Sequence, residues 1–393
     1  MPDLFKHIGS LFLREAKLVA KDHSLLLTLL LAPLLYAFFY GSIYSYKVEE
    51  KVLLAAVDED RSELSRTFLA QINHLQIAAV MQATDLHEAQ QKMYYGDCQG
   101  FLYIPKGMQA NVLALKQADV VLAVNAARFL PSSELAGAVT TIGMAVGAGV
   151  RLRYQEMKGL NSEMAMQEAM PVNLDYRPLF NTQSSYGAFL LPGLLALILQ
   201  QTLLIGLAES VALERQRKMI RQLVDAGGSS VSAAFLGKGV FYFVLFAAYA
   251  CFFMTVNYHI LQIPFRGHAR DVATALALFL LALIPLGMWL GTLFKTQLLA
   301  AQLMAFSTYP VFLLAGYAWP YQSLPPALQI VSSLLPTTPF IHMYASIVQA
   351  GGTLADNKGA LVHLAALCVL YTLLALWRLS ALKQREAFSG IDK

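Results

Sequence analysis

Long apolar runs without charged residues are the dominant pattern in this chain. A helix needs roughly 20 apolar residues to cross the ~30 Å hydrocarbon core of a bilayer. Six runs approach or exceed that length, and each holds at most one charged residue. They cover residues 24–44, 186–208, 235–257, 272–294, 299–318 and 360–377. The pattern therefore predicts a six-helix transmembrane bundle.

Residues 45–185 follow a different pattern, in which short apolar runs alternate with segments of helical periodicity. Strands are expected at 52–57, 75–81, 100–104 and 119–125. Helices are expected at 64–72 and 86–93, and a long one from Ser132 to about Leu160. Alternation of strands and helices predicts a small α/β domain inserted between the first two spans. Asp58, Glu59 and Asp60 end the first strand, and we interpret them as a solvated strand end rather than a metal site.

Two basic segments flank the spans. In residues 1–23 apolar positions recur at helical spacing among four basic residues, which predicts an amphipathic helix in the membrane interface. The alternative is a plain extension of the first span. Residues 209–234 predict a short helix with Leu213, Ile220, Leu223 and Val224 on one face and basic residues on the other. Such a helix could rest on lipid phosphates or dock on a partner.

Residues 296–355 contain no Asp, Glu, Lys or Arg, and prolines interrupt the stretch repeatedly. Beyond the span at 299–318, two short helices are expected at 327–335 and 340–349. Irregular backbone at membrane depth is tolerated only where protein covers it or where it lines a cavity. We therefore predict a re-entrant segment at 319–350 near the outer leaflet, with a loose apolar loop as the alternative.

The charge distribution gives the expected orientation. The chain is 57% hydrophobic and 14% charged, with a net charge of +4. Residues 1–23, 209–234, 295–298 and 378–393 hold 13 Lys and Arg together, against 3 in 258–271 and 319–359. Basic residues favour the cytoplasmic side. This predicts cytoplasmic termini, a cytoplasmic tail at 378–393, an uncleaved first span and an extracytoplasmic α/β domain.

Several kinds of chemistry are excluded by the motifs that the sequence lacks. It contains no GxxxxGK[ST] nucleotide-binding loop, no HExxH and no GxSxG, and its three cysteines have no metal-ligand spacing. The basic residues lie beside apolar runs, so we expect no nucleic-acid partner. The predicted spans hold almost no ionisable residues, which argues against a carrier driven by protons or sodium. The adjacent Gln200 and Gln201 could line a pathway or hydrogen-bond neighbouring helices.

The order of these parts resembles the type-2 ABC exporter permease family, and within it the bacterial drug-efflux permeases with six spans and a large insert. The resemblance covers essentially the whole chain. It is carried by the stretches 95–105, 189–196 and 316–339. It implies a permease subunit of the bacterial inner membrane that moves an amphipathic or lipid-like substrate or a drug outward. The permease itself would hold no cofactor, since a partner subunit would bind ATP.

The resemblance also implies roles for particular residues. The loop helix would couple to the ATPase through Glu214, Arg215, Arg217, Lys218 and Arg221. Glu214 matches the family's acidic position, but Lys218 and Met219 replace a glycine-threonine pair and Arg221 replaces a glutamate. The partner would accordingly have a more acidic docking cleft. Pathway or gate positions would be Gln200, Gln201, Pro320, Pro336 and Pro339.

The implied partners are an ATP-binding subunit, a second permease copy or a paralogue, membrane lipids, and a periplasmic adaptor with an outer-membrane channel. A function of another class stays open at this point, namely a membrane-anchored sensor or scaffold whose outer domain binds a ligand or partner. No arrangement of residues in the sequence supports an enzyme.

Overall fold

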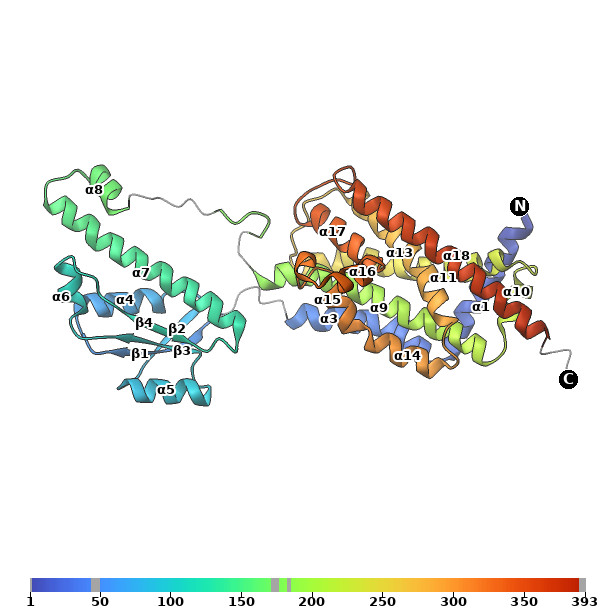
Figure 1. Cartoon of the computed structure of the whole chain (residues 1–393), viewed down its shortest axis with the longest axis horizontal. Coiled ribbons are helices and arrows are strands. Elements are labelled where there is room, and N and C mark those ends of the chain that lie inside the picture. Colours follow the sequence, from blue (N-terminus) through green and yellow to red (C-terminus); the bar gives the residue numbers. More distant parts are fainter. Residues whose placement is uncertain (1, 44–49, 171–176, 182–184, 389–393) are drawn as a thin grey trace. The chain divides into compact units, whose positions relative to one another are not determined.

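The computed structural model describes residues 2–43, 50–170, 177–181 and 185–388. The chain divides into two compact units, one formed by residues 1–45 and 178–393 and the other by residues 46–177 (Figure 1). The first unit is helical, and the second contains the β-sheet.

The helical unit begins with α1 (Pro2–Lys21), whose apolar and polar residues are segregated on opposite faces. The first span is continuous through α2 (His23–Leu26), the π-helical turn η1 (Leu27–Leu31) and α3 (Ala32–Ile43). The other long helices are α9 (Tyr186–Gln216), α11 (Val231–Phe252), α13 (Ala269–Gly291) and α18 (Lys358–Phe388). The span after α13 consists of α14 (Gln297–Phe306) and α15 (Thr308–Leu314).

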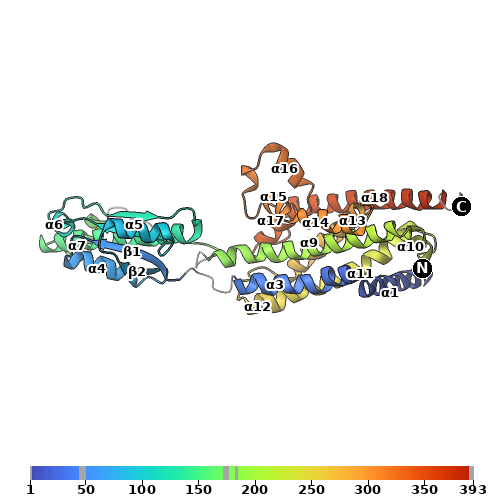
Figure 2. The same ribbon diagram turned by 90° about the horizontal axis from the view of Figure 1, so that it is seen from below.

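Shorter elements connect these helices. Between α9 and α11 lies α10 (Ile220–Ala226), and α11 continues through the π-helical turn η2 (Phe253–Asn257) into α12 (Tyr258–Ile260). The segment before α18 holds the 3₁₀ turn η3 (Tyr321–Ser323), α16 (Pro326–Ser333) and α17 (Thr337–Val348). The two proline-flanked helices expected between residues 319 and 350 are therefore present. In Figures 1 and 2, α1 and α10 lie at one end of the helical unit, together with the end of α18, whereas α12 and α16 lie toward the opposite end.

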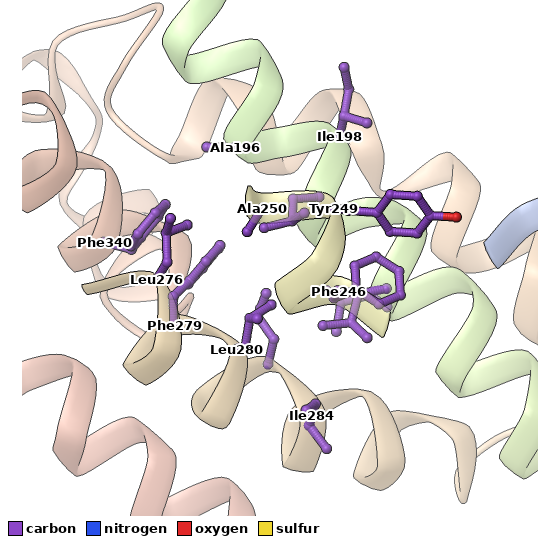
Figure 3. Close-up of a cluster of buried hydrophobic side chains, with 14 of the residues drawn as sticks. Ala196, Ile198, Phe246, Tyr249, Ala250, Leu276, Phe279, Leu280, Ile284 and Phe340 are labelled. Carbon is purple, nitrogen blue, oxygen red and sulfur yellow. The ribbon is translucent and has the colours of Figure 1, made fainter. Parts of the chain in front are cut away.

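Helix α9 is the centre of this unit and is buried on nearly all sides. Its apolar side chains pack with those of α11, α13, α17 and α18 in one continuous core. Figure 3 shows the aromatic part of this core, where the rings of Phe279 and Phe340 stack with centroids 3.8 Å apart. Helix α17 supplies Phe340, Met343, Tyr344, Ile347 and Val348 to the core, whereas most of α16 is exposed.

Among the described residues, seven helical segments are long and apolar enough to cross a membrane. Six coincide with the six runs predicted from the sequence. The seventh is α7 (Phe129–Met157), which belongs to the sheet-containing unit. Leu135 and Val139 of α7 are buried against the sheet, and Gln99 donates a hydrogen bond to Ser132 Oγ at 2.6 Å. The α7 helix is therefore part of the inserted fold, as its predicted position within the insert implied.

Within residues 50–170, four strands form one sheet in the order β2-β1-β3-β4. Strand β1 (Val52–Asp58) pairs in parallel with β2 (Ala78–Gln82) and β3 (Gly100–Ile104), and β4 (Val121–Val124) is antiparallel to β3. One face of the sheet packs on α4 (Glu63–Asn73), α6 (Met108–Leu113) and α7, and the other on α5 (Leu86–Tyr95). A last helix, α8 (Ser162–Ala169), contacts α7. The prediction of a mostly helical protein with an inserted α/β region is confirmed.

The acidic cluster after β1 fixes turns of the insert. Asp58 accepts hydrogen bonds from Arg61 N at 2.9 Å and Ser65 Oγ at 2.7 Å. Asp60 accepts from Gly107 N at 2.7 Å and Gln109 N at 3.0 Å. These carboxylates thus satisfy backbone donors at the start of α4 and α6. No group of His, Cys, Asp and Glu side chains suited to a metal occurs among the described residues.

Candidate functional site

The amphipathic helix α1 packs directly on α11. A Cβ atom placed on Gly237 would lie 2.5 Å from Cδ1 of Leu11, so the glycine allows the two helices to approach closely. Leu11 also belongs to a small apolar cluster with Leu223 and Val224 of α10. Helix α1 therefore packs against both the first turns of α11 and the short helix α10.

A buried ion cluster lies at this junction. Glu15 of α1 accepts hydrogen bonds from Lys238 Nζ at 2.5 Å, Ser210 Oγ at 2.7 Å and the hydroxyl of Tyr242 at 2.9 Å. Glu15 is 0% exposed and Lys238 only 2%. The partners come from two other helices, since Ser210 belongs to α9, and Lys238 and Tyr242 to α11.

A second carboxylate extends the cluster. Glu214 of α9 accepts a hydrogen bond from Lys238 Nζ at 3.1 Å and one from Arg14 Nη1 at 2.5 Å. Glu214 is also fully buried, whereas the side chain of Arg14 is 22% exposed. Two positive and two negative charges thus join α1, α9 and α11. We call Arg14, Glu15, Ser210, Glu214, Lys238 and Tyr242 the ion cluster.

The electrostatics of the ion cluster explain why charges are tolerated here. Burying an unpaired charge costs several kcal/mol, whereas a hydrogen-bonded opposite charge offsets much of that cost. Desolvation by burial raises the pKa of Glu15. The ammonium of Lys238 and the hydrogen bonds from Lys238, Ser210 and Tyr242 outweigh this effect and lower the pKa below its ordinary value. Glu15 is therefore a carboxylate at neutral pH.

The ion cluster is not saturated with hydrogen bonds. Within the described part of the chain, Arg14 Nη2 and Glu15 Oε2 have no hydrogen-bond partner. Arg14 Nη1 lies 3.9 Å from that oxygen. The cluster therefore contains buried polar atoms that its contacts do not satisfy.

The prediction of a short helix that carries Leu213, Ile220, Leu223 and Val224 on one face is wrong for Leu213. Residues up to Gln216 continue α9, and α10 begins only at Ile220. At the break, Met219 N donates to Glu214 O at 2.8 Å and Lys218 N to Arg215 O at 3.1 Å. This is a Schellman-type helix end, and Lys218 takes the left-handed position with φ 55°. Ile220, Leu223 and Val224 are buried as expected, but Leu213 lies on α9.

The break divides the five predicted coupling residues into two groups. Glu214 is buried in the ion cluster, so it offers no exposed side chain for direct contact with a partner. Arg215 donates to the carbonyl oxygens of Thr292 at 2.7 Å and Phe294 at 2.8 Å, which closes the end of α13. Arg217, Lys218 and Arg221 are exposed on one short stretch, which we call the basic surface.

The basic surface is attached to the helical bundle through contacts with α18. Arg221 N donates to Glu386 Oε2 of α18 at 2.9 Å, and Lys383 donates to Ser229 O at 2.9 Å. Ile220 packs with Leu379 and Leu382 of α18. The surface is thus held by α18 as well as by α1 through Leu223 and Val224.

Sequence reasoning missed Arg14, Glu15, Ser210, Lys238 and Tyr242 as members of a site. A signal was available, because Lys238 is the one charged residue in the apolar run 235–257. A buried lysine requires a carboxylate partner, and Glu15 lies in the amphipathic helix. The sequence contains no information on their proximity, since 223 residues separate them.

Gln200 and Gln201 are buried and connect α9 to neighbouring helices. Gln200 Oε1 accepts a hydrogen bond from Thr337 Oγ1 at the start of α17, and Gln201 Nε2 donates to Thr308 Oγ1 at 2.9 Å. Both glutamines thus make hydrogen bonds between helices, which is one of the two roles considered for them from the sequence.

The predicted gate prolines mark the ends of the short helices. Pro320 precedes the turn η3, Pro336 precedes α17, and Pro339 is buried in the first turn of α17. Between α15 and η3, the hydroxyl of Tyr317 donates to Phe189 O of α9 and accepts from Gln349 Nε2, the latter at 2.9 Å. The proline-flanked segment is therefore attached to the beginning of α9.

Comparison with known proteins identifies the family. The profile described as ABC-2 family transporter protein matches residues 23–377. The probable multidrug ABC transporter permease YbhS of Escherichia coli K12 is 22% identical over 360 residues, which cover 88% of this chain and 89% of YbhS. The probable multidrug ABC transporter permease YbhR of the same organism is 27% identical over 195 residues, covering 49% of this chain and 53% of YbhR.

These matches confirm the resemblance noted in the sequence. They agree with the several apolar spans and the inserted sheet of the fold. Permeases of ABC transporters pair with ATP-binding subunits. The chain belongs to the ABC-2 family of transporter proteins and is a multi-pass membrane permease subunit without an ATPase domain.

Proposed function

We propose that this permease exports an amphipathic or lipid-like substrate or a drug outward across the bacterial inner membrane, driven by a separate ATPase subunit. The observation that carries the proposal is the ion cluster beside the basic surface, because together they connect an exposed contact region to the buried helix α9. The names of the relatives YbhS and YbhR, both probable multidrug permeases, support the substrate class.

The basic surface is the docking site for the ATPase in this proposal. Arg217, Lys218 and Arg221 lie exposed within five residues and suit an acidic cleft on the partner. Movement of the docked ATPase would reach α9 through the short break at Lys218. It would reach α1 through the packing of Leu11 on Leu223 and Val224.

The ion cluster would convert this movement into a change of the bundle. Glu15 and Arg14 of α1 hold α9 through Ser210 and Glu214, so displacement of α1 pulls on the central helix. At its other end α9 contacts the segment around Tyr317, and Gln200 contacts the start of α17. One helix thus joins the docking side to the proposed outer gate at Pro320, Pro336 and Pro339.

The orientation follows the positive-inside rule. The basic surface and the ends of α1 and α18 would face the cytoplasm, and the α/β insert would lie outside. A second permease copy or a paralogue would complete the pathway. The insert could then meet a periplasmic adaptor leading to an outer-membrane channel.

The test is reconstitution of the permease with a candidate ATP-binding subunit from the same organism. We expect the double variant Arg217→Glu, Lys218→Glu to lose co-purification and substrate-stimulated ATP hydrolysis. Arg66→Glu, which reverses an exposed basic residue of the insert, is the matched control and should retain both. Nucleotide-independent transport by the permease alone would overturn the proposal.

A sensor or scaffold is the second candidate, favoured by one observation. The insert has a pocket of about 770 Å³ between α4, α6 and α7, lined in part by Glu63, Gln109, Arg153 and Tyr154. A sensor of this kind would bind a ligand there without moving it across the membrane. In that case, deletion of residues 50–170 would abolish signalling, and the full-length protein would show no export activity.

A further inference from the structure

A lateral groove opens on the surface of the helical unit between α11 and α13. Its volume is about 390 Å³. The groove is distinct from the ion cluster, the basic surface and the segment around Tyr317, and none of their residues lines it. Its walls are formed by Phe243, Ala247, Ala250, Cys251, Met254, Thr255, Phe265, Ala269, Val272, Ala273, Leu276, Ala277 and Leu280.

The groove is almost entirely apolar. Its floor consists of buried side chains that include Val272, Leu276 and Leu280. Of the thirteen lining residues, only Thr255 carries a side-chain oxygen or nitrogen. The hydroxyl of Thr255 donates to Cys251 O at 2.7 Å, so it needs no partner from an occupant. A polar ligand would lose its own hydrogen bonds here, which selects a hydrocarbon.

Small side chains create the space. Alanines line both helices, and the turn η2 replaces the regular end of α11 beside Met254 and Thr255. Along α13 the lining runs from Ala269 to Leu280, which is about 16 Å of helix. That length is about half of the ~30 Å hydrocarbon core, so the groove matches a chain from one leaflet.

Two exposed arginines are next in sequence to residues that line one end of the groove. Phe265 and Ala269 line it at that end, and Arg266 and Arg270 each follow one of them directly in the sequence. The guanidinium of Arg270 makes no hydrogen bond or ion pair within the described chain, and that of Arg266 lies 5.6 Å above the ring of Phe180. The neighbouring carboxylate of Asp271 accepts from Leu354 N at 3.4 Å. These two arginines are therefore candidates to attract an anionic group to this end of the groove.

We propose that this groove binds one acyl chain of an anionic phospholipid from the surrounding bilayer, with the phosphate held by Arg266 and Arg270. The apolar lining takes the chain, the length selects one leaflet, and the charge of the two arginines selects the head group. The site needs neither nucleotide nor ATPase, so it stands independently of the export function proposed above.

Native mass spectrometry of the full-length permease in a neutral detergent tests the proposal. The probes are phosphatidylglycerol and phosphatidylcholine with the same acyl chains. We expect the chain to retain phosphatidylglycerol preferentially, and Arg266→Gln with Arg270→Gln to lower that preference roughly tenfold. Both arginines are exposed, so this variant leaves the core intact.

A variant that fills the groove separates the acyl-chain site from general lipid contact. Ala273→Trp places a large ring among the lining residues and should abolish retention of phosphatidylglycerol. The matched control is Ala366→Trp, which changes an exposed alanine of α18 and should leave retention unchanged. Equal binding of the two lipids, or undiminished retention by Ala273→Trp, overturns the proposal.

Thiol labelling provides a measurement that does not depend on a substitution. Cys251 is exposed in the groove, whereas Cys368 lies on α18 and donates to Leu281 O at 3.2 Å. Added phosphatidylglycerol should slow alkylation of Cys251 relative to Cys368 in the unmodified chain. If only an exported amphiphile protects Cys251 and phosphatidylglycerol does not, the groove is a substrate site and the lipid proposal is wrong.

Discussion

The ring of Tyr317 rests on the bare backbone of Gly193. A Cβ atom at Gly193 would overlap the ring carbons Cδ1 and Cε1 of Tyr317, and the same ring stacks on Phe189 with centroids 5.2 Å apart. Glycine at this position of α9 is therefore what allows the turn after α15 to lie against the central helix.

Substitution of this glycine should release the contact. Gly193→Ala must displace the ring of Tyr317 and is expected to cost about 1–3 kcal/mol, as overpacking of a buried contact does. The melting temperature of the purified permease measures the effect. Gly9→Ala in α1 is the control, because nothing lies within 4 Å of its added Cβ and alanine favours the helix. Equal melting of the two variants would show that the ring is not held by this contact.

Removal of the lysine in the ion cluster should be strongly destabilising. Lys238→Met leaves Glu15 and Glu214 without their shared buried cation, and breaking such a cluster costs roughly 3–5 kcal/mol. Thermal unfolding in detergent is the measurement. Lys218→Met, at an exposed position, should change stability by no more than about 0.5 kcal/mol. The additional change Glu15→Gln should recover part of the loss, since it removes the carboxylate charge that Lys238 neutralised, whereas Glu214 keeps its contact with Arg14.

Acid should weaken the attachment of α1. Because the pKa of Glu15 is lower in the folded chain than in the unfolded chain, its carboxylate stabilises the fold at neutral pH. That stabilisation is present above the unfolded pKa of about 4.3 and is lost as the pH falls toward the folded value. Melting temperatures between pH 7 and pH 3 should therefore decline more steeply for the unmodified chain than for Glu15→Gln. Parallel curves would contradict this assignment.

The inserted sheet offers a separate test at Gly100. A Cβ there would overlap Ala123 O of the neighbouring strand β4 and lie 3.1 Å from Val124 Cα. Gly100→Ala should therefore weaken the pairing of β3 and β4, which hydrogen exchange in residues 100–104 and 121–124 would detect. Gly147→Ala in α7 is the matched control, because its added Cβ meets nothing within 4 Å. Unchanged exchange in the strands would show that β4 can move away at little cost.

Local patterns predicted the strands, the long helices and the short helices of the proline-flanked segment well. Each of these depends on periodicity or on prolines within a few residues, as in β1, α4 and α17. The end of α9 could not be predicted in the same way. No glycine or proline lies between Gly206 and Gly227, and the left-handed residue is Lys218. Tertiary packing, not local preference, places this break.

The ion cluster could not be predicted from the sequence for a related reason. The pattern identified Lys238 as an isolated charge and Glu214 as a member of a charged loop. It gave no reason to bring either of them to Glu15, because the pairing depends on how α1 lies across α9 and α11. The sequence pattern placed Glu214 in a charged loop and gave no role to Glu15, whereas both carboxylates are fully buried.

The composition of the ion cluster has a consequence for the energetics of transport. Arg14 and Glu15 leave or enter the cluster together, because both lie on α1, and their charges cancel. Moving one elementary charge through the membrane field is worth about 2.3 kcal/mol per 100 mV, but a displacement of this pair moves no net charge. In the proposed mechanism, movement of this pair would therefore add no voltage dependence, and ATP hydrolysis in the partner subunit would supply the energy.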